Sequence, residues 1–290
     1  MNKNALSFFA SAGLLAAATI WGFAFVVVKD SLAFLGAFYI IALRFTIAWI
    51  AMACVFFSRL KKINARSLVH GAILGLFLFA AYAFQTVGLL YTTVGKNAFL
   101  TTFYIILIPI FAWILTKKKP DFYTLFAAIF AIAGIALLSL AGNGDTFSIN
   151  IGDALTLLCS VFYALHILYT EKYNKTESAL LLTILQFFFA SVFAWILSPF
   201  FDGAFPAKAV QNARVIFSLL YLGIASTMIA FALQNVGLKF VRSSLASLFL
   251  SFESVFGVLF GVLLLGEAMN IRIFFGCALI FFAVILAQWK

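Results

Sequence analysis

Ten long apolar runs constrain this chain more than any other feature of its sequence. Each run has about 20 mostly apolar residues, the length that an α-helix needs to cross a bilayer, and short polar breaks separate the runs. We therefore expect an all-α integral membrane protein with ten transmembrane helices. The predicted spans are Leu6–Val28, Ala33–Phe57, Leu68–Leu90, Gly95–Leu115, Phe122–Leu140, Gly152–Thr170, Ala179–Phe201, Arg214–Val236, Ser244–Leu265 and Ile271–Trp289.

The composition excludes most soluble classes. Of the 290 residues, 66% are hydrophobic and 10% are charged, and the mean hydropathy is +1.16. A soluble domain is roughly 45–50% apolar and about 25% charged, so a water-soluble globule of this size would lack the polar groups to cover its surface. The net charge of +10 is therefore interpreted as a signal of orientation in a membrane, and no nucleic-acid partner is expected.

The polar breaks between the runs alternate between basic and nearly neutral ones. Because Lys and Arg collect in cytoplasmic loops, this alternation predicts that both termini are cytoplasmic, in a multi-pass protein of the plasma (inner) membrane. The basic residues assigned to the cytoplasmic side are Lys3, Arg59, Lys61, Lys62, Arg66, Lys117, Lys118, Lys119, Lys172, Lys175, Lys239, Arg242 and Lys290.

An internal repeat is the strongest motif in the sequence. AYAFQTVGL at Ala81–Leu89 and AFALQNVGL at Ala230–Leu238 are identical at six of nine positions, with an offset of 149 residues. Earlier in each half the best offset is about 142 residues, which pairs Arg44 with Gln186 and Trp21 with Tyr163. The chain is therefore predicted to consist of two related halves.

Five crossings in each half make the predicted repeat an inverted one. Residues 1–145 are expected to form the first five-helix repeat, and residues 146–290 the second, which starts on the opposite face of the membrane. Inverted repeats of this kind are typical of secondary transporters, whose substrate lies near the midplane between the halves while the two faces open alternately. Two G-x-x-x-G patterns, Gly71–Gly75 and Gly257–Gly261, indicate close helix packing.

The motifs along the chain resemble a known family. Over nearly its whole length the chain is similar to the EamA-type proteins of the drug/metabolite transporter superfamily, although Ser254 stands where that family often has proline. The resemblance implies export or exchange of small metabolites, often amino acids or drug-like compounds, across the inner membrane. The segments that carry it are Ile20–Lys29, Ala42–Phe45, Gly88–Trp113, Gly134–Leu140, Gly152–Leu155 and Phe252–Glu267.

Arg44 and Glu253 are the two charged residues expected near the centre of the bilayer. At 1.5 Å per residue, Arg44 lies about 16 Å from one face and Glu253 about 14 Å from the other. An ionised side chain at that depth costs roughly 2.5–3.5 kcal/mol on insertion scales. The two residues are therefore expected either to face an aqueous cavity and bind charged groups of the substrate, with Glu253 able to exchange a proton, or to hold helices together as a structural pair.

Polar and aromatic residues inside the spans complete the candidate substrate site. Gln85 and Gln234 occupy equivalent repeat positions, and their amides suit a polar or zwitterionic substrate; hydrogen bonding between helices is the alternative. Tyrosine and tryptophan rings within the spans are expected to line a pocket or to serve ordinary packing. The remaining candidates are Trp21, Tyr82, Tyr104, Tyr163, Asn97 and His166.

The function that these features favour is a secondary transporter that moves a small metabolite, an amino acid or a related compound, outward by alternating access. A proton-coupled exporter of drugs or cations is the alternative, and a channel or a non-transporting assembly component is the alternative from another class. No enzyme activity and no cofactor are expected, because phosphate-loop, dinucleotide and metal-ligand patterns are missing from the sequence. The expected partners are a small-molecule substrate, membrane lipid and, as a coupling ion, a proton; the oligomeric state is left open.

Overall fold

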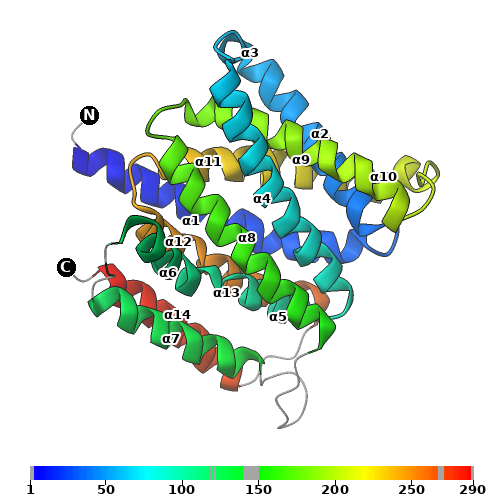
Figure 1. Ribbon diagram of the computed structural model, residues 1–290. Coiled ribbons are helices and arrows are strands. Elements are labelled where there is room, and N and C mark those ends of the chain that lie inside the picture. Colours follow the sequence, from blue (N-terminus) through cyan, green and yellow to red (C-terminus); the bar gives the residue numbers. More distant parts are fainter. Residues whose placement is uncertain (1–2, 118, 120–121, 140–149, 267–270, 289–290) are drawn as a thin grey trace.

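The chain folds into a bundle of helices (Figure 1). The computed structural model describes residues 3–117, 119, 122–139, 150–266 and 271–288, and every regular element within them is helical. The α-helices are α1 (Lys3–Ser31), α2 (Ala37–Val55), α3 (Phe57–Leu60), α4 (Ala65–Leu90), α5 (Val94–Thr101), α6 (Tyr104–Thr116), α7 (Phe122–Ser139), α8 (Ile151–Tyr173), α9 (Ala179–Phe201), α10 (Ala213–Leu220), α11 (Ala230–Gly237), α12 (Ser243–Leu250), α13 (Phe252–Leu265) and α14 (Ile271–Gln288).

The prediction of an all-α membrane protein is confirmed. Among the residues that the structure describes, eight helical segments are long and apolar enough to cross a membrane, and α5 with α6, α10 with α11, and α12 with α13 each form one such segment. Two further apolar helices are shorter, Leu125–Gly134 within α7 and Phe274–Ala283 within α14. A total of ten spans therefore stays a prediction, as does the boundary between residues 145 and 146, which lies outside the described residues.

The predicted start of the second span was wrong. The sequence places it at Ala33, but α2 begins at Ala37, after an extended Gly36. The preceding residues form turns instead, in which the N–H groups of Ala33 and Phe34 donate to the carbonyls of Asp30 and Ser31. Hydropathy does not detect this boundary, because the turn residues are as apolar as the helix that follows.

The predicted fourth and ninth spans are each interrupted by a tight turn at equivalent positions. Thr102 separates α5 from α6, and Ser251, which is 149 residues later, separates α12 from α13. The hydroxyl of each residue donates to the carbonyl three positions earlier, Phe99 and Leu248 respectively, in both cases at 2.7 Å. Such back-bonding competes with the regular helical pattern and bends a helix.

The predicted eighth span contains a π-helix between α10 and α11. This wider stretch runs over Tyr221–Ile229, and the Thr227 hydroxyl donates to the Leu222 carbonyl five residues earlier at 2.7 Å. Gly223 allows the stretch to lie against α2, since a Cβ there would be 2.6 Å from Cγ2 of Ile47. Single π-helical insertions are rare and often occur at functional sites.

The helices of one half pack mainly against helices of the other half. α1 contacts α13 and α11, and in the same way α8 contacts the α5–α6 span and α4. α2 packs on its counterpart α9, and α7 packs on its counterpart α14 along the lower edge of the view in Figure 1. Exchanging the two halves reproduces these contacts, which is what a two-fold relation between them requires.

Small residues permit the closest helix crossings. A Cβ on Gly22 of α1 would lie 2.4 Å from Cβ of Phe256 on α13, and one on Gly71 of α4 would lie 2.4 Å from Cβ of Leu185 on α9. Any larger side chain at either position would push the helices apart. The Gly71–Gly75 pattern thus lies at the packing surface that the sequence predicts.

Candidate functional site

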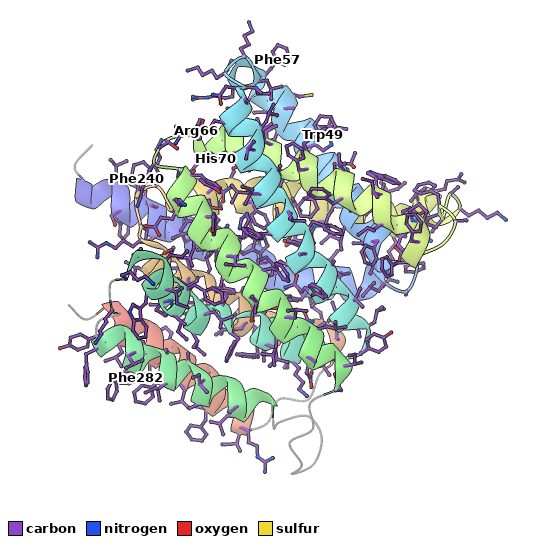
Figure 2. All side chains as sticks on the ribbon, in the orientation of Figure 1. Trp49, Phe57, Arg66, His70, Phe240 and Phe282 are labelled. Carbon is purple, nitrogen blue, oxygen red and sulfur yellow. The ribbon has the colours of Figure 1, made fainter. Side chains whose placement is uncertain are left out.

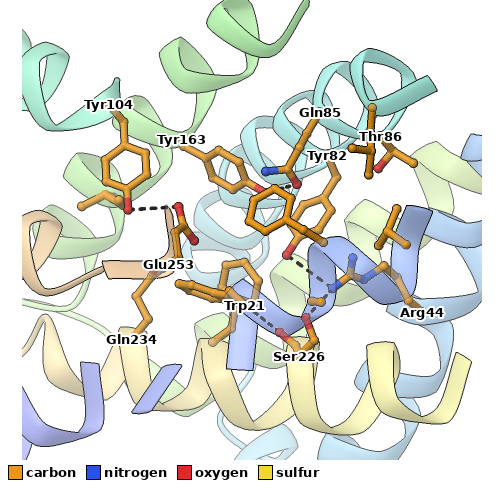
Figure 3. A pocket seen from close by; sticks show the side chains of 16 residues that line it. Trp21, Arg44, Tyr82, Gln85, Thr86, Tyr104, Tyr163, Ser226, Gln234 and Glu253 are labelled. Atoms are coloured by element: carbon orange, nitrogen blue, oxygen red, sulfur yellow. Dashed lines mark hydrogen bonds between the residues drawn. The ribbon is translucent and has the colours of Figure 1, made fainter. Parts of the chain in front are cut away.

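A pocket lies between the two halves of the bundle (Figure 3). It contains about 530 Å³ of space that no protein atom fills, including some open solvent. It draws its walls from α1, α2, α4, α6, α8, the π-helix, α11 and α13. The lining residues are Trp21, Ala24, Phe25, Val28, Arg44, Tyr82, Gln85, Thr86, Leu89, Tyr104, Tyr163, Ile167, Ser226, Phe231, Gln234 and Glu253.

Eight of the ten residues singled out from the sequence line this one pocket. They come from segments far apart in the chain, and the structure brings together Trp21, Arg44, Tyr82, Gln85, Tyr104, Tyr163, Gln234 and Glu253. Asn97 and His166 are not among the lining residues. The pocket therefore brings together the repeat-equivalent residues and the buried polar residues that the sequence indicates.

The pocket wall is built from repeat-equivalent pairs. Tyr104 and Glu253 are such a pair, with the Tyr104 hydroxyl donating to Oε1 of Glu253 at 3.3 Å. Tyr82 and Phe231 are another pair, and their ring centroids are 6.1 Å apart. Because both members of each pair meet, the two-fold relation between the halves passes through the pocket.

Arg44 of α2 is buried, with 2% of its surface exposed. Its Nε donates to the Thr227 hydroxyl at 3.0 Å, and its Nη2 donates to the Ser226 hydroxyl at 2.9 Å. Both hydroxyls belong to the π-helix, and the guanidinium carbon also lies 4.4 Å from the centroid of the Tyr82 ring. The hydroxyls and the aromatic face accommodate the cation without neutralising its charge.

Glu253 is the acidic group of the pocket, 6% exposed, in the first turn of α13. The tight turn at Ser251 places it there, just as the equivalent turn at Thr102 places Tyr104 at the start of α6. The helix N-terminus favours a negative charge. Within the described part of the chain, the Tyr104 hydroxyl is the group that donates a hydrogen bond to this carboxylate.

Arg44 and Glu253 do not neutralise each other. Neither side chain takes part in an ion pair with any described residue. Rings lie between them in Figure 3, with the centroids of Tyr82 and Tyr163 5.7 Å apart. The two residues therefore do not form a structural pair, although Arg44 does join α2 to the π-helix through the hydroxyls of Ser226 and Thr227. The pocket presents one cationic and one acidic pole.

The two glutamine amides differ despite their equivalent positions. Nε2 of Gln85 donates to the Thr101 hydroxyl at 3.0 Å, and its Oε1 accepts from the Tyr163 hydroxyl at 3.2 Å. Within the described residues, Nε2 of Gln234 has a single long contact of 3.4 Å, with Oδ1 of Asn235. Gln85 is therefore held in a hydrogen-bond network, whereas Gln234 keeps most of its hydrogen-bonding capacity.

Asn97 lies behind the wall of the pocket. Its Nδ2 donates to the Thr156 hydroxyl at 2.8 Å and to the Gln85 carbonyl at 3.2 Å. These bonds tie α5 to α8 and α4. The expectation that its side chain lines the substrate site was wrong, because the amide points into the helix interface.

His166 also lies behind the wall, on α8. Its Nε2 is 3.0 Å from Oε1 of Gln186, and its ring meets the Phe231 ring edge to face at 5.9 Å. Phe231 lines the pocket and separates the imidazole from it. His166 therefore does not line the pocket in this conformation, and its contact with a substrate stays a prediction.

A network of charged groups joins neighbouring helices at the end of the bundle at which α1 and α4 finish. Nζ of Lys29 donates to the Leu89 and Thr92 carbonyls at 2.6 and 3.1 Å. Nζ of Lys96 is 2.6 Å from Oδ2 of Asp153, whose Oδ1 accepts from the Thr92 hydroxyl at 3.0 Å. A cation at a helix C-terminus and a carboxylate at a helix N-terminus are both favourable placements.

Three residues on the π-helix side of the pocket were missed by sequence reasoning. Phe231 is the repeat counterpart of Tyr82, so the repeat itself contained the signal for it. Ser226 and Thr227 are adjacent hydroxyl residues within an apolar span; Ser226 lines the pocket and Thr227 holds Arg44 from behind. Their role depends on the π-helix, which has no recognisable sequence pattern.

Comparisons with known proteins agree with this architecture. The chain matches the EamA-like transporter family twice, over residues 8–140 and 150–289. It belongs to that family. An Archaeoglobus fulgidus protein named an uncharacterized transporter is 34% identical over 282 residues, which cover 97% of this chain and 86% of the relative.

A more distant relative and a solved structure also match this chain over nearly its whole length. The Bacillus subtilis uncharacterized transporter YetK is 26% identical to this EamA-like protein, covering 91% of this chain and 82% of the relative. A solved crystal structure also matches this chain. The TM-score is 0.75 at 18% sequence identity, and the match covers 96% of both chains. That likeness concerns the fold. The EamA-like protein is thus a multi-pass integral membrane protein of a transporter family.

Proposed function

We propose that this protein is a secondary transporter that exports a small metabolite, an amino acid or a related compound, by alternating access. The observation that carries the proposal is the pocket between the halves, with Arg44 and Glu253 unpaired at two separate points of its wall. A zwitterion would place its carboxylate on the guanidinium and its ammonium group on the Glu253 carboxylate. Such a ligand compensates both buried charges at once.

The remaining wall suits a solute with an apolar body. Four aromatic rings form a connected part of this wall: the Trp21 and Phe231 centroids are 4.8 Å apart, and the Tyr82 centroid is 6.1 Å from that of Phe231 and 5.7 Å from that of Tyr163. Flat aromatic faces favour apolar and aromatic groups, while Gln234 offers an amide that still has free capacity. A small amphipathic amino acid fits this combination.

The two-fold relation between the halves supports alternating access. When related halves surround one site, exchanging their conformations closes one entrance and opens the other. The relatives named as transporters agree with transport. The basic residues of the loops favour a cytoplasmic location of both termini and a place in the plasma membrane, and export is the direction that the family resemblance implies.

Proton-coupled export of cationic compounds is the second candidate. The observation that favours it is the isolation of Glu253 from any described cation. A carboxylate in that setting exchanges a proton for a cation at the same site. Binding of a lipophilic cation would then weaken as the pH falls.

A thermal-shift screen of metabolites at two pH values tests the proposal. A ligand of the folded state raises the melting temperature by mass action. The proposal predicts amino acid hits that disappear in Glu253→Gln and persist in the control Glu177→Gln, whose carboxylate lies near His70 and Arg66 outside the pocket. Hits confined to lipophilic cations and lost at low pH would favour the second candidate, and amino acid hits unaffected by Glu253→Gln would contradict the proposed site.

A further inference from the structure

A second buried polar cluster lies beside the pocket, between α8, α9 and α11. Hydrogen bonds join these helices: Nδ2 of Asn235 donates to the Thr183 hydroxyl at 2.7 Å, and Nδ2 of Asn174 donates to the Asn235 carbonyl at 2.8 Å. All members of the cluster are at most 4% exposed. We call this cluster the polar seam, and it consists of His166, Thr170, Asn174, Thr183, Gln186 and Asn235.

Several polar atoms of the seam lack a hydrogen-bond partner among the described residues. They are Nδ1 of His166, the hydroxyl oxygen of Thr170, Oδ1 of Asn174 and Nε2 of Gln186. Buried polar groups of native proteins are nearly always paired. Four such unpaired atoms lie on neighbouring turns of two helices. They raise the free energy of this conformation, and packing alone does not explain why they are there.

The repeat relates the seam to the pocket. Adding 142 to Ala24, Val28 and Arg44 gives His166, Thr170 and Gln186. Adding 149 to Thr86 gives Asn235. The four residues of the first half line the pocket, and their four counterparts belong to the seam. The seam therefore occupies in the second half the place that one side of the pocket occupies in the first.

The Phe231 ring forms the partition between the two spaces. It faces the pocket beside Trp21, with centroids 4.8 Å apart, and it meets the His166 ring on its other side at 5.9 Å. Its counterpart Tyr82 lies inside the pocket wall, with its ring centroid 4.4 Å from the guanidinium carbon of Arg44. A shift of Phe231 would join the pocket to the seam.

From this relation we infer that the polar seam is the second half of the translocation pathway, closed in this conformation and opened when the two halves exchange conformations. This inference rests on the proposed alternating access. Val28 marks the half that the pocket occupies, towards the end at which α1 and α4 finish, and Thr170 marks the closed half, towards the end at which α8 finishes. In the exchanged conformation the unpaired seam atoms bind water and the neutral hydrogen-bonding groups of the solute.

The two halves differ in charge at one of these paired positions. Gln186 stands where the first half has Arg44, and it meets His166 at 3.0 Å rather than a charged group. The seam therefore lacks an arginine at the position that would bind the carboxylate of a solute. A carboxylate bound at Arg44 loses that contact when it moves into the seam, so the seam favours release.

Cysteine accessibility from the two sides of the membrane tests this inference. Thr170→Cys and its repeat counterpart Val28→Cys are made in a background without the natural Cys54, Cys159 and Cys277. Each is treated with a charged, membrane-impermeant methanethiosulfonate reagent in right-side-out and inside-out vesicles. Ala190→Cys is the control, because Ala190 of α9 is fully buried and its backbone N would lie 3.2 Å from a Cβ on Gly75 of α4. Melting temperatures establish that each variant folds, and Gln186→Cys replaces Thr170→Cys if the latter does not.

The expected result is labelling of Val28→Cys from one side and of Thr170→Cys from the opposite side. A minor conformation is typically populated at roughly 0.1–10%, so Thr170→Cys should react about 10- to 1,000-fold more slowly than Val28→Cys and still faster than Ala190→Cys. Thr170→Cys labelling no faster than that of Ala190→Cys, with Val28→Cys labelled, would overturn the inference and leave the pocket intact. Labelling of both from the same side, or of neither, would overturn alternating access as well.

Discussion

Tyr104 and Glu253 hold equivalent places in the two halves and join them through one hydrogen bond of 3.3 Å, from the Tyr104 hydroxyl to Oε1 of Glu253. Each residue follows a tight turn made by a hydroxyl side chain, Thr102 in one half and Ser251 in the other. The pair therefore lies where the two halves meet and where both spans bend. A conformational exchange between the halves acts directly on this contact.

Removing the Tyr104 hydroxyl should alter ligand binding more than folding. In Tyr104→Phe the carboxylate of Glu253 loses its donor, so we expect weaker stabilisation by amino acid ligands in thermal-shift titrations. Tyr104→Phe combined with Glu253→Gln should show strong non-additivity, because the two groups act through one contact. Fully additive effects of the two substitutions would show that the hydrogen bond does not couple them.

Loss of the Thr227 hydroxyl should destabilise the protein through Arg44. Thr227→Val keeps the shape of the side chain but leaves Nε of Arg44 without its acceptor, at a cost of about 1–3 kcal/mol. Thr19→Val is the matched control, since that hydroxyl donates to the Leu15 carbonyl of its own helix, and its effect should stay within about 0.5 kcal/mol. Reversible unfolding in mixed micelles measures both; equal effects would mean that Thr227 does not support Arg44.

The two glutamines should separate into a structural one and a ligand-binding one. Gln85→Ala removes the partners of Tyr163 and Thr101, so it should lower the melting temperature. Gln234→Ala breaks only a 3.4 Å contact, so it should leave the melting temperature nearly unchanged and reduce the ligand-induced shift. The reverse pattern would contradict the assignment made from their hydrogen bonds.

A methyl group at the crossing of α1 and α13 should be disruptive. In Gly22→Ala the new Cβ would lie 2.4 Å from Cβ of Phe256, and overpacking of this kind costs about 1–3 kcal/mol. The control is Gly13→Ala on the same helix, where the nearest atom to a new Cβ is Cδ2 of Leu233 at 3.4 Å. Comparable melting temperatures for the two variants would contradict the observed crossing.

Asp202, which contacts the N-terminal end of α2, should make the melting temperature of the protein depend on pH. Its Oδ2 accepts from the Tyr39 N–H at 2.8 Å, and burial raises the pKa of Asp202, although the N–H groups of Tyr39 and Phe38 act in the opposite direction. A raised folded-state pKa means that folding favours the protonated carboxyl, so this contribution is present at low pH and is lost as the pH rises through that pKa.

The comparison with Asp202→Asn isolates this effect, because the amide keeps an acceptor for Tyr39. We expect the melting temperature of the wild type minus that of Asp202→Asn to fall as the pH rises from about 3 to about 7, across the usual range of aspartate titration. A difference that grows with pH would show that the hydrogen bonds outweigh burial at this carboxyl.

The sequence predicts the arrangement of the helices well because bilayer thickness and hydropathy determine it. It also predicts half of the residues that line the pocket, since the repeat by itself pairs residues such as Gln85 and Gln234. The all-atom view in Figure 2 shows, in contrast, aromatic side chains such as Trp49, Phe57 and Phe282 distributed over the outside of the bundle. Most of the phenylalanines therefore carry no information about the site.

What the sequence does not predict depends on contacts between distant segments. The tight turns at Thr102 and Ser251 arise from hydroxyl groups that are equally compatible with a straight helix. His166 lies on α8 three residues after the lining residue Tyr163, but Phe231 from α11 covers it. The unequal environments of the two glutamines likewise depend on Thr101 and Tyr163, which no repeat offset reveals.

Substrate counterflow tests the central claim most directly. Proteoliposomes loaded with an unlabelled amino acid mixture are diluted into a trace of the same mixture labelled with a heavy isotope, and the label inside is followed by mass spectrometry. Alternating access through the pocket predicts a transient accumulation of label above its equilibrium level, abolished in Glu253→Gln. A monotonic approach to equilibrium at the same rate in the wild type and in Glu253→Gln would contradict the account.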